Sequence, residues 1–188
     1  MDHFLDFRLL PDPEFSSATL MNALFAKLHR SLVEINNRQL GISFPDVKPS
    51  VPTLGHCLRL HGTIDSLKPL LARNWLAGMR DHVTAGEIER VREGVSYCRV
   101  RRVQVKSNAE RQRRRYYKRH PEAREVDVIS KMPDTAERKV TLPFVRVRSQ
   151  STGQQFCLFL EHLPPQSHPI AGEFNSYGLS ANATVPWF

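Results

Sequence analysis

Long apolar runs, clustered cysteines and a targeting segment are all missing from this sequence of 188 residues. No stretch approaches the roughly 18 consecutive apolar residues that a membrane-spanning helix needs. Residues Met1–Phe4 show neither the basic nor the apolar region of a signal peptide, so we expect a cytoplasmic protein. Cys57, Cys98 and Cys157 lie far apart, which predicts reduced, buried thiols rather than a disulfide framework.

Motifs for metal and nucleotide binding are also absent. The eight histidines form no HxH or HExxH pair and no CxxC occurs, so we predict no metal site and no cofactor. There is no GxGxxG motif and no Walker lysine. His56 and Cys57 are adjacent, but neighbours on a strand point to opposite faces, which disfavours a Cys–His hydrolase. Acidic residues are sparse near the basic region, which disfavours two-metal nuclease chemistry.

Positive charge, in contrast, is concentrated in one segment. The net charge is +8, yet the 21 residues from Arg99 to Arg119 carry ten cations against Glu110 alone, which gives a net charge of +9. The rest of the chain therefore sums to −1. Concentrated charge of one sign is typical of a protein that binds a polyanion.

The apolar patterning of the first half predicts a ferredoxin-like domain over residues 1–94. The expected elements are strands over 4–10, 40–44, 58–60 and 83–91, and helices that begin at Ser16 or Ser17 and at Asp65. This β-α-β-β-α-β order is the ferredoxin-like order. The RNA-recognition fold shares it, but its RNP1 signature is missing here.

The second half, residues 95–188, is predicted to form an α/β lobe, which makes the whole fold α+β. The expected elements are strands over 97–106, 142–149, 155–162 and 174–179, and helices over 108–120 and 122–131. A hairpin turn is expected at 151–153, where Ser, Thr and Gly follow one another. In strand 97–106, alternation predicts Val103 and Val105 facing the core, with Arg102, Gln104 and Lys106 on the other face.

The basic segment predicts an exposed, arginine-rich helix over 108–120. Ser107 and Glu110 have the spacing of a capping box, which indicates a helix rather than a tail. Its cations occupy nearly the whole circumference and leave no apolar stripe to bury. A solvated surface helix is the alternative, but such helices mix charges of both signs to gain ion pairs. We therefore favour a helix that binds nucleic acid phosphates.

The strand before this helix offers base-reading side chains. Arg suits the O6/N7 edge of guanine and Gln the N6/N7 edge of adenine, so Arg102 and Gln104 are candidates. An exposed polar strand face explains the same residues equally well. Side chains rarely reach bases in the deep, narrow major groove of A-form RNA, so the open end of a stem-loop is the expected target.

Chemistry is not evident from single residues. A partly buried structural role is the commoner one for a histidine at a helix edge, such as His29. Taken alone, Ser151 is a turn residue, Tyr177 a strand aromatic and Phe156 a core residue of a hairpin.

Several motifs taken together resemble the CRISPR repeat-processing endoribonucleases of type I-F systems, also called the Ypest subtype. The residues that carry the resemblance are Met1–His3, Lys27–His29, Arg102–Gln104, Lys106–Asn108, Glu110–Arg111, Arg113–Arg115, Leu142–Val145, Arg148–Gln154, Tyr177–Ser180 and Val185–Phe188. The resemblance spans the whole chain. It implies a ferredoxin-like domain, a lobe with an arginine-rich helix, and a partner RNA, the precursor crRNA repeat stem-loop.

The resemblance also implies roles for individual residues. His29 would be the general base, Ser149 would hold the ribose 2′-OH and Tyr177 would orient the site. Arg102 and Gln104 would read a guanine and an adenine at the base of the stem, and Phe156 would stack on the terminal base pair. Contacts to the RNA backbone would come from Lys106, Ser107, Asn108, Arg111, Arg113, Arg114, Arg115, Lys118, Arg119, His120 and Ser151, with Arg115 near the scissile phosphate.

The implied reaction needs no metal, because RNA supplies its own nucleophile, the 2′-OH, and an imidazole can take its proton near neutral pH. Cleavage at the 3′ base of the stem would leave a 2′,3′-cyclic phosphate and a 5′-OH. The protein would keep the crRNA product and join other Cas proteins in a type I-F surveillance complex. Two alternatives remain open: a catalytically inert hairpin-binding subunit of a CRISPR ribonucleoprotein, and a ribosomal or DNA-binding basic protein.

Overall fold

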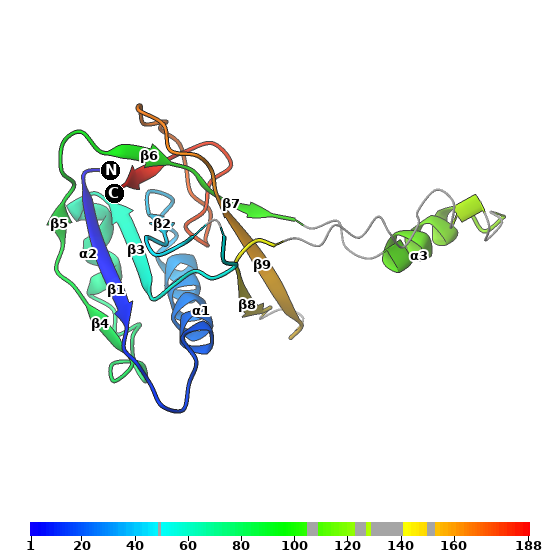
Figure 1. Ribbon diagram of the computed structural model, residues 1–188, viewed down its shortest axis with the longest axis horizontal. Helices are drawn as coiled ribbons and strands as arrows, with labels where there is room; N and C mark the ends of the chain where they lie inside the picture. Colours follow the sequence, from blue (N-terminus) through cyan, green and yellow to red (C-terminus); the bar gives the residue numbers. More distant parts are fainter. Residues whose placement is uncertain (49, 105–108, 123–126, 129–140, 150–152) are drawn as a thin grey trace. The chain divides into compact units, whose positions relative to one another are not determined.

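The computed structural model of the chain describes residues 1–188 except 49, 105–108, 123–126, 129–140 and 150–152 (Figure 1). The side chains of 109–112 and 115 are also outside the description. Contacts divide the chain into two compact units. Unit 1 consists of Met1–Val103 and Leu142–Phe188, and unit 2 of Gln104–Thr141. The predicted α+β class is confirmed, because helices and antiparallel sheets are both present.

The first part of unit 1 is an antiparallel sheet with two helices. Its elements are β1 (His3–Leu9), α1 (Ser17–Ile35), β2 (Gly41–Ser43), β3 (Cys57–Gly62), α2 (Ile64–Leu71), β4 (Val83–Ala85) and β5 (Glu89–Arg90). The strand order is β2-β3-β1-β4, with β5 also paired to β1. The single strand expected over 83–91 is thus two short ones. They are separated near Gly86, whose N–H donates to the Asp6 carbonyl at 2.8 Å.

The remaining strands of unit 1 form two smaller sheets. They are β6 (Ser96–Cys98), β7 (Val100–Val103), β8 (Phe144–Arg148), β9 (Gln155–His162) and β10 (Val185–Trp187). One sheet pairs β10 with β6, and the other has the order β7-β9-β8. The prediction of one strand over 97–106 is wrong for its described part. At Arg99 the chain leaves the β10-β6 sheet and enters the β7-β9-β8 sheet, so β6 and β7 have different partners.

The predicted final strand over 174–179 is also wrong. These residues form a turn in which the Asn175 side-chain oxygen accepts from the Tyr177 N–H at 2.8 Å and the Leu179 N–H at 3.3 Å. Gly178 has a φ of 71°, in the left-handed region. Local side-chain hydrogen bonds therefore replaced strand pairing, and the last strand is β10.

The predicted orientation of Val103 needs correction as well. Val103 pairs with the half-buried Phe159, whereas Arg102 pairs with the fully buried Leu160. Paired residues of an antiparallel ladder point to the same face, so Val103 lies on the face away from Leu160. Arg102 extends from the core-facing side at the edge of the sheet, where it is exposed. Val105 and Lys106 lie outside the described residues.

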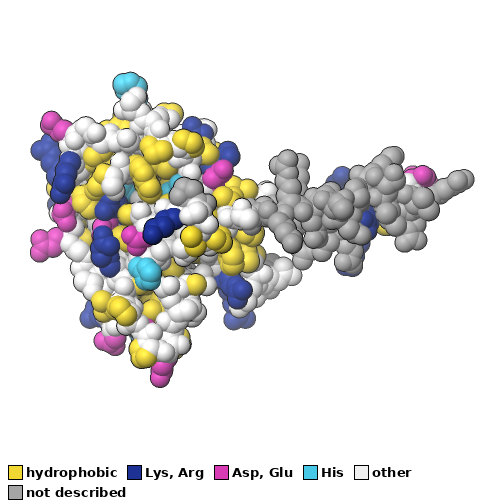
Figure 2. Space-filling model, viewed as in Figure 1, with side chains coloured by type: hydrophobic (Ala, Val, Ile, Leu, Met, Phe, Trp, Pro, Cys, Tyr) yellow, Lys and Arg dark blue, Asp and Glu magenta, His cyan; other side chains and the backbone are white. Residues whose placement is uncertain are grey.

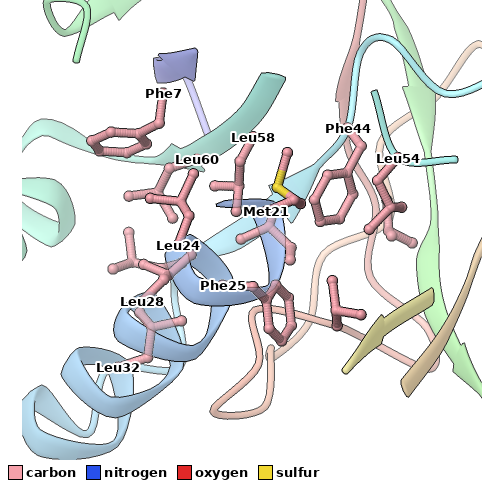
Figure 3. Packing of buried hydrophobic residues seen from close by; sticks show 14 of the residues in the cluster. Phe7, Met21, Leu24, Phe25, Leu28, Leu32, Phe44, Leu54, Leu58 and Leu60 are labelled. Carbon is pink, nitrogen blue, oxygen red and sulfur yellow. The ribbon is translucent and has the colours of Figure 1, made fainter. Parts of the chain in front are cut away.

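Helix α1 follows the sequence prediction closely. Ser16 is the N-cap, and its hydroxyl accepts from the Thr19 N–H at 3.3 Å. The helix ends at Asn36, which has a left-handed φ of 47°. The apolar stripe is buried as Leu20, Met21, Leu24, Phe25, Leu28 and Leu32. Figure 3 shows Leu24, Leu28 and Leu32 along one side of the helix, with Leu58 and Leu60 of β3 nearby.

Both faces of β3 are buried, including its polar residues. Leu58 and Leu60 face α1, whereas Arg59 and His61 point to the other side of the sheet and are still only 7% and 0% exposed. His61 shares a hydrogen bond of 2.8 Å with the Ser43 hydroxyl. Nearby, Nε2 of His162 accepts from the Phe44 N–H at 3.2 Å. The fully buried His61 and the half-buried His162 therefore both lie beside β2.

These histidines predict a loss of stability in mild acid. Burial lowers the pKa of His162 to about 4, and burial together with Arg59 lowers the pKa of His61 well below its ordinary value. The unfolded chain binds more protons than the folded one below pH ~6.5, so the free energy of unfolding falls as the pH drops from there towards 4. For His162 the full loss is roughly 3 kcal/mol at most.

Urea unfolding at pH 7, 6 and 5 measures this effect. We expect the His162→Gln variant, whose amide can still accept from Phe44, to lose less stability between pH 7 and 5 than the wild type does. A wild-type unfolding midpoint that stays constant from pH 7 to 5 would contradict the prediction.

The prediction that all three cysteines are buried is correct for two of them. Cys57 and Cys98 are buried free thiols as expected, but Cys157 is exposed, because it lies on the outer face of β9.

One hydrophobic core includes residues on both sides of position 94, among them Leu5, Leu60 and Leu160. The division into domains 1–94 and 95–188 stays a prediction. None of the helices in the described part of the chain is long and apolar enough to cross a membrane.

Candidate active site and nucleic-acid interface

His29 contacts a loop that lies 147 residues further along the chain. Its Nδ1 atom is 2.8 Å from the carbonyl oxygen of Ser176. Its ring stacks on the ring of Tyr177, with centroids 3.9 Å apart and planes 13° from parallel. Tyr177 also lies parallel to Phe25, one helical turn before His29, at 6.1 Å. The structure thus brings together two of the predicted catalytic residues, His29 and Tyr177.

The contact with Ser176 decides which ring nitrogen of His29 carries the proton. A carbonyl oxygen can only accept, so Nδ1 must donate. In the neutral imidazole the lone pair then lies on Nε2. His29 is half-buried, and its stacked ring has little rotational freedom. The arrangement presents a histidine whose Nε2 can accept a proton from a bound molecule.

The loop that holds His29 is itself attached to the core. We call residues 175–179 the Tyr177 loop. The Gly178 carbonyl accepts from the Ile42 N–H of β2 at 3.0 Å. A Cβ atom at Gly178 would lie 2.7 Å from the Ile42 side chain, so only glycine fits this contact. Sequence reasoning missed Asn175 and Ser176, although Asn and Gly three residues apart are turn signals.

Ser149 lies at the end of β8, in the hairpin that joins β8 to β9. Its N–H donates to the Gln154 carbonyl and its carbonyl accepts from the Gly153 N–H, each at 2.9 Å. The first part of β8 is attached to α1, since Asn22 accepts from the Arg146 N–H at 2.8 Å. The helix that carries His29 and the strand that directly precedes Ser149 are therefore packed together. The predicted role of Ser149 stays a prediction.

A second pair of predicted residues meets on the β7-β9-β8 sheet. The Arg102 guanidinium lies 5.7 Å from the centre of the Phe156 ring. Arg102 is exposed and Phe156 half-buried, against the edge of the core. This contact brings together a predicted base-reading side chain and the predicted stacking aromatic. Gln104, the other candidate, is exposed and belongs to unit 2.

Unit 2 contains the basic helix α3 (Ala109–Arg119), close to the predicted range of 108–120. Arg114, Lys118, Arg119 and His120 are exposed, and Arg113 is half-buried. The Tyr116 and His120 rings lie 4.5 Å apart. The predicted residues Lys106, Ser107, Asn108 and Ser151 lie outside the described residues, as do the side chains of Arg111 and Arg115 and most of the helix expected over 122–131.

Charge on unit 1 is mixed rather than of one sign. Figure 2 shows cationic and acidic side chains interspersed with hydrophobic ones on the viewed face of this unit. This agrees with the sequence of unit 1, which contains 16 Lys and Arg residues and 13 Asp and Glu residues.

The state of the Cys57 thiol disfavours the Cys–His alternative. Burial raises the pKa of the Cys57 thiol to about 12, so this residue is a structural thiol and not a thiolate nucleophile. Within the described residues, no three or more His, Cys, Asp and Glu side chains are grouped so that they could hold a metal ion.

Comparison with known proteins identifies the class. The family model described as CRISPR-associated protein (Cas_Csy4) matches residues 4–188. A protein of Pseudomonas aeruginosa (strain UCBPP-PA14) is 50% identical over 188 residues, the whole of both chains, and is named CRISPR-associated endonuclease Cas6/Csy4. A protein of Escherichia coli (strain UTI89 / UPEC) with the same name is 46% identical, again over the full length of both. The chain is therefore a CRISPR-associated protein. Within that class, it belongs to the Csy4 family.

Proposed function

We propose that this protein is the CRISPR repeat-processing endoribonuclease of a type I-F system and that it acts without a metal ion. The relatives from Pseudomonas aeruginosa and Escherichia coli are named as endonucleases. The observation that carries the catalytic part is the pair of contacts that His29 makes with the Ser176 carbonyl and the Tyr177 ring. It leaves Nε2 of His29 as a proton acceptor.

In the proposed reaction the RNA supplies the nucleophile. Nε2 of His29 takes the proton of a ribose 2′-OH, and the oxygen attacks the adjacent phosphorus. A bond forms between the 2′ oxygen and phosphorus while the bond to the 5′ oxygen breaks, and that oxygen takes up a proton. The products are a 2′,3′-cyclic phosphate and a 5′-OH. Ser149 would hold the 2′-OH, and Tyr177 would keep the imidazole in orientation.

Binding would come from the basic helix and the base-reading strand. The cations of α3 would contact the phosphates of the repeat hairpin, with Arg115 near the cut and with Lys106, Ser107, Asn108 and Ser151 as further backbone contacts. Arg102 and Gln104 would read the base of the stem, and Phe156 would stack on its last base pair. The contact between Arg102 and the Phe156 ring supports this, because it holds the guanidinium beside the stacking surface.

The proposed fold of the N-terminal part, the location and the partners are those that the resemblance to the family implies. The strand order β2-β3-β1-β4 supports a ferredoxin-like arrangement of the N-terminal part. The protein would act in the cytoplasm, retain its crRNA product and associate with other Cas proteins of a surveillance complex.

A cleavage assay in EDTA tests the proposal. A labelled type I-F repeat hairpin is incubated with excess protein, and the ends of the products are identified. We expect cleavage at the 3′ base of the stem with a cyclic phosphate. Tight binding without cleavage would replace the proposal by an inert hairpin-binding subunit, and equal affinity for long DNA would indicate a general basic protein.

Base reading by Arg102 makes a separate prediction. Arg102→Ala should reduce the discrimination between the correct hairpin and one with an altered stem-base pair by about 1–3 kcal/mol. Competition binding with the two hairpins measures it. Arg101→Ala is the matched control, since Arg101 is on the same strand and is paired instead with Glu161 at 2.8 Å. Equal discrimination by Arg102→Ala and the wild type would show that Arg102 does not read the base.

A further inference from the structure

We infer that Asn175 is a positioning residue for catalysis, which acts through His29 without touching the RNA. The inference rests on the proposed function, since it explains how the general base of that reaction acquires the correct tautomer. Neither the sequence patterning nor the resemblance assigned a role to Asn175.

The side chain and backbone of Asn175 form the turn of the Tyr177 loop. The Asn175 side-chain oxygen accepts from the Tyr177 N–H at 2.8 Å and from the Leu179 N–H at 3.3 Å. Its backbone completes the turn, because its N–H donates to Leu179 and its carbonyl accepts from Gly178, at 2.9 and 2.8 Å. Asn175 is exposed, so these bonds are the structural reason for an amide there rather than burial.

This turn holds in place the groups that contact His29. The two groups that contact His29 are the Ser176 carbonyl and the Tyr177 ring, and both lie between the ends of the turn. The far side of the loop is fixed to β2 through Gly178 and Ile42. On the near side, the Phe174 N–H donates to the Arg38 carbonyl at 2.9 Å, and the Asn175 side chain accepts from the Tyr177 N–H within the turn. Without the Asn175 side chain, the peptide between Ser176 and Tyr177 can rotate, and the carbonyl no longer faces Nδ1.

The position of the Ser176 carbonyl affects the tautomer of His29. The hydrogen bond at Nδ1 determines which nitrogen of the imidazole bears the proton. If the Ser176 carbonyl turns away, Nε2 can carry the proton instead and can no longer accept one from the 2′-OH. RNA affinity comes from other residues, so the loss should appear in the cleavage step and not in binding.

The experiment compares Asn175→Ala, Asn175→Asp and Asn37→Ala in the full-length protein. Aspartate keeps the accepting oxygen. Asn37 is the matched control, because its side-chain oxygen makes the same kind of turn with the Gln39 N–H at 2.8 Å. Two quantities are measured: the ring-nitrogen NMR shifts of His29 without RNA, assigned with a His29→Gln variant, and the single-turnover cleavage rate at saturating protein with the hairpin Kd.

We expect His29 of the wild type to be protonated on Nδ1 in its neutral form. Asn175→Ala should mix the two tautomers and lower the saturating cleavage rate by about tenfold or more, with the Kd unchanged. Asn175→Asp and Asn37→Ala should retain the wild-type tautomer, and their saturating rates should stay within about threefold of the wild type.

Three results would overturn the inference: a wild-type tautomer in Asn175→Ala, no recovery in Asn175→Asp, or an equal loss in Asn37→Ala, which would mean general destabilisation. If the wild type binds the hairpin but does not cut it, the proposed function fails, while the NMR comparison still decides whether Asn175 sets the tautomer.

Discussion

Replacing His29 by alanine is expected to abolish cleavage of the repeat hairpin while leaving its affinity nearly unchanged. General base catalysis contributes roughly 10²–10⁴-fold to a rate, so the single-turnover rate of His29→Ala should fall by at least two orders of magnitude. The His29 side chain is half-buried against the Tyr177 loop. It is not part of the basic helix, from which most of the RNA affinity is expected to come. Single-turnover cleavage and filter binding, measured on the same hairpin, separate the two effects.

An exposed histidine of unit 1 provides the control for this experiment. His168→Ala removes an imidazole of the same size from an exposed position and should cut like the wild type. If His29→Ala retains more than about a tenth of the wild-type rate, the general base is another group. In that event the contact with Ser176 would be structural. Loss of hairpin binding in His29→Ala would likewise contradict the separation of binding from cutting.

The second large effect is expected at Asp6, the partner of the buried Arg59. The Arg59 guanidinium donates to the two carboxylate oxygens of Asp6 at 2.6 and 2.9 Å, and to the main-chain oxygen of Phe188 at 3.1 Å. It also lies over the rings of Phe4 and Phe188, 4.6 and 4.2 Å from their centres. The side chains of Arg59 and Asp6 are only 9% and 16% exposed.

Asp6→Asn leaves the buried guanidinium without the side-chain carboxylate that it pairs with. Removing one partner of a buried ion pair destabilises a protein by about 3–5 kcal/mol, and we expect a value near the lower limit because Asp6 keeps some contact with solvent. The urea midpoint at pH 7 measures the change. Glu34→Gln is the control, since the Arg73–Glu34 pair is exposed and should contribute less than about 1 kcal/mol.

Equal midpoints for the two variants would contradict this prediction. They would mean that the aromatic rings and the main-chain oxygen of Phe188 alone compensate the charge of Arg59. The pair also bears on the fold, because it connects β1 and β3 to Phe188 on the side of the sheet opposite α1.

Features with local causes were predictable from the sequence. The cap at Ser16 and the apolar stripe of α1 depend on residues within a few positions of one another, and the structure confirms both. The β8–β9 hairpin and the helix near 108–120 are also local, and α3 begins and ends within one residue of the expected limits.

Features that depend on distant partners were not predictable. Alternation over 97–106 gave no sign that the strand changes sheets at Arg99, because the exchange depends on where β10 and β9 lie. The strand predicted over 58–60 did not indicate that Arg59 and His61 would be buried, because their burial depends on other parts of the chain. Over 174–179, buried Phe174 and Leu179 resembled a strand pattern, while Asn175 and Gly178 determined a turn.

The sequence by itself determined the α+β class, the long helix that carries His29 and the concentration of charge between Arg99 and Arg119. Each follows from spacing and composition along the chain. Only the tertiary structure decided the state of His29. Its proton lies on Nδ1 because a carbonyl 147 residues away accepts there, and its ring is oriented by Tyr177 of the same loop. Such a contact has no local signature, because it exists only once β2, α1 and the Tyr177 loop have packed together.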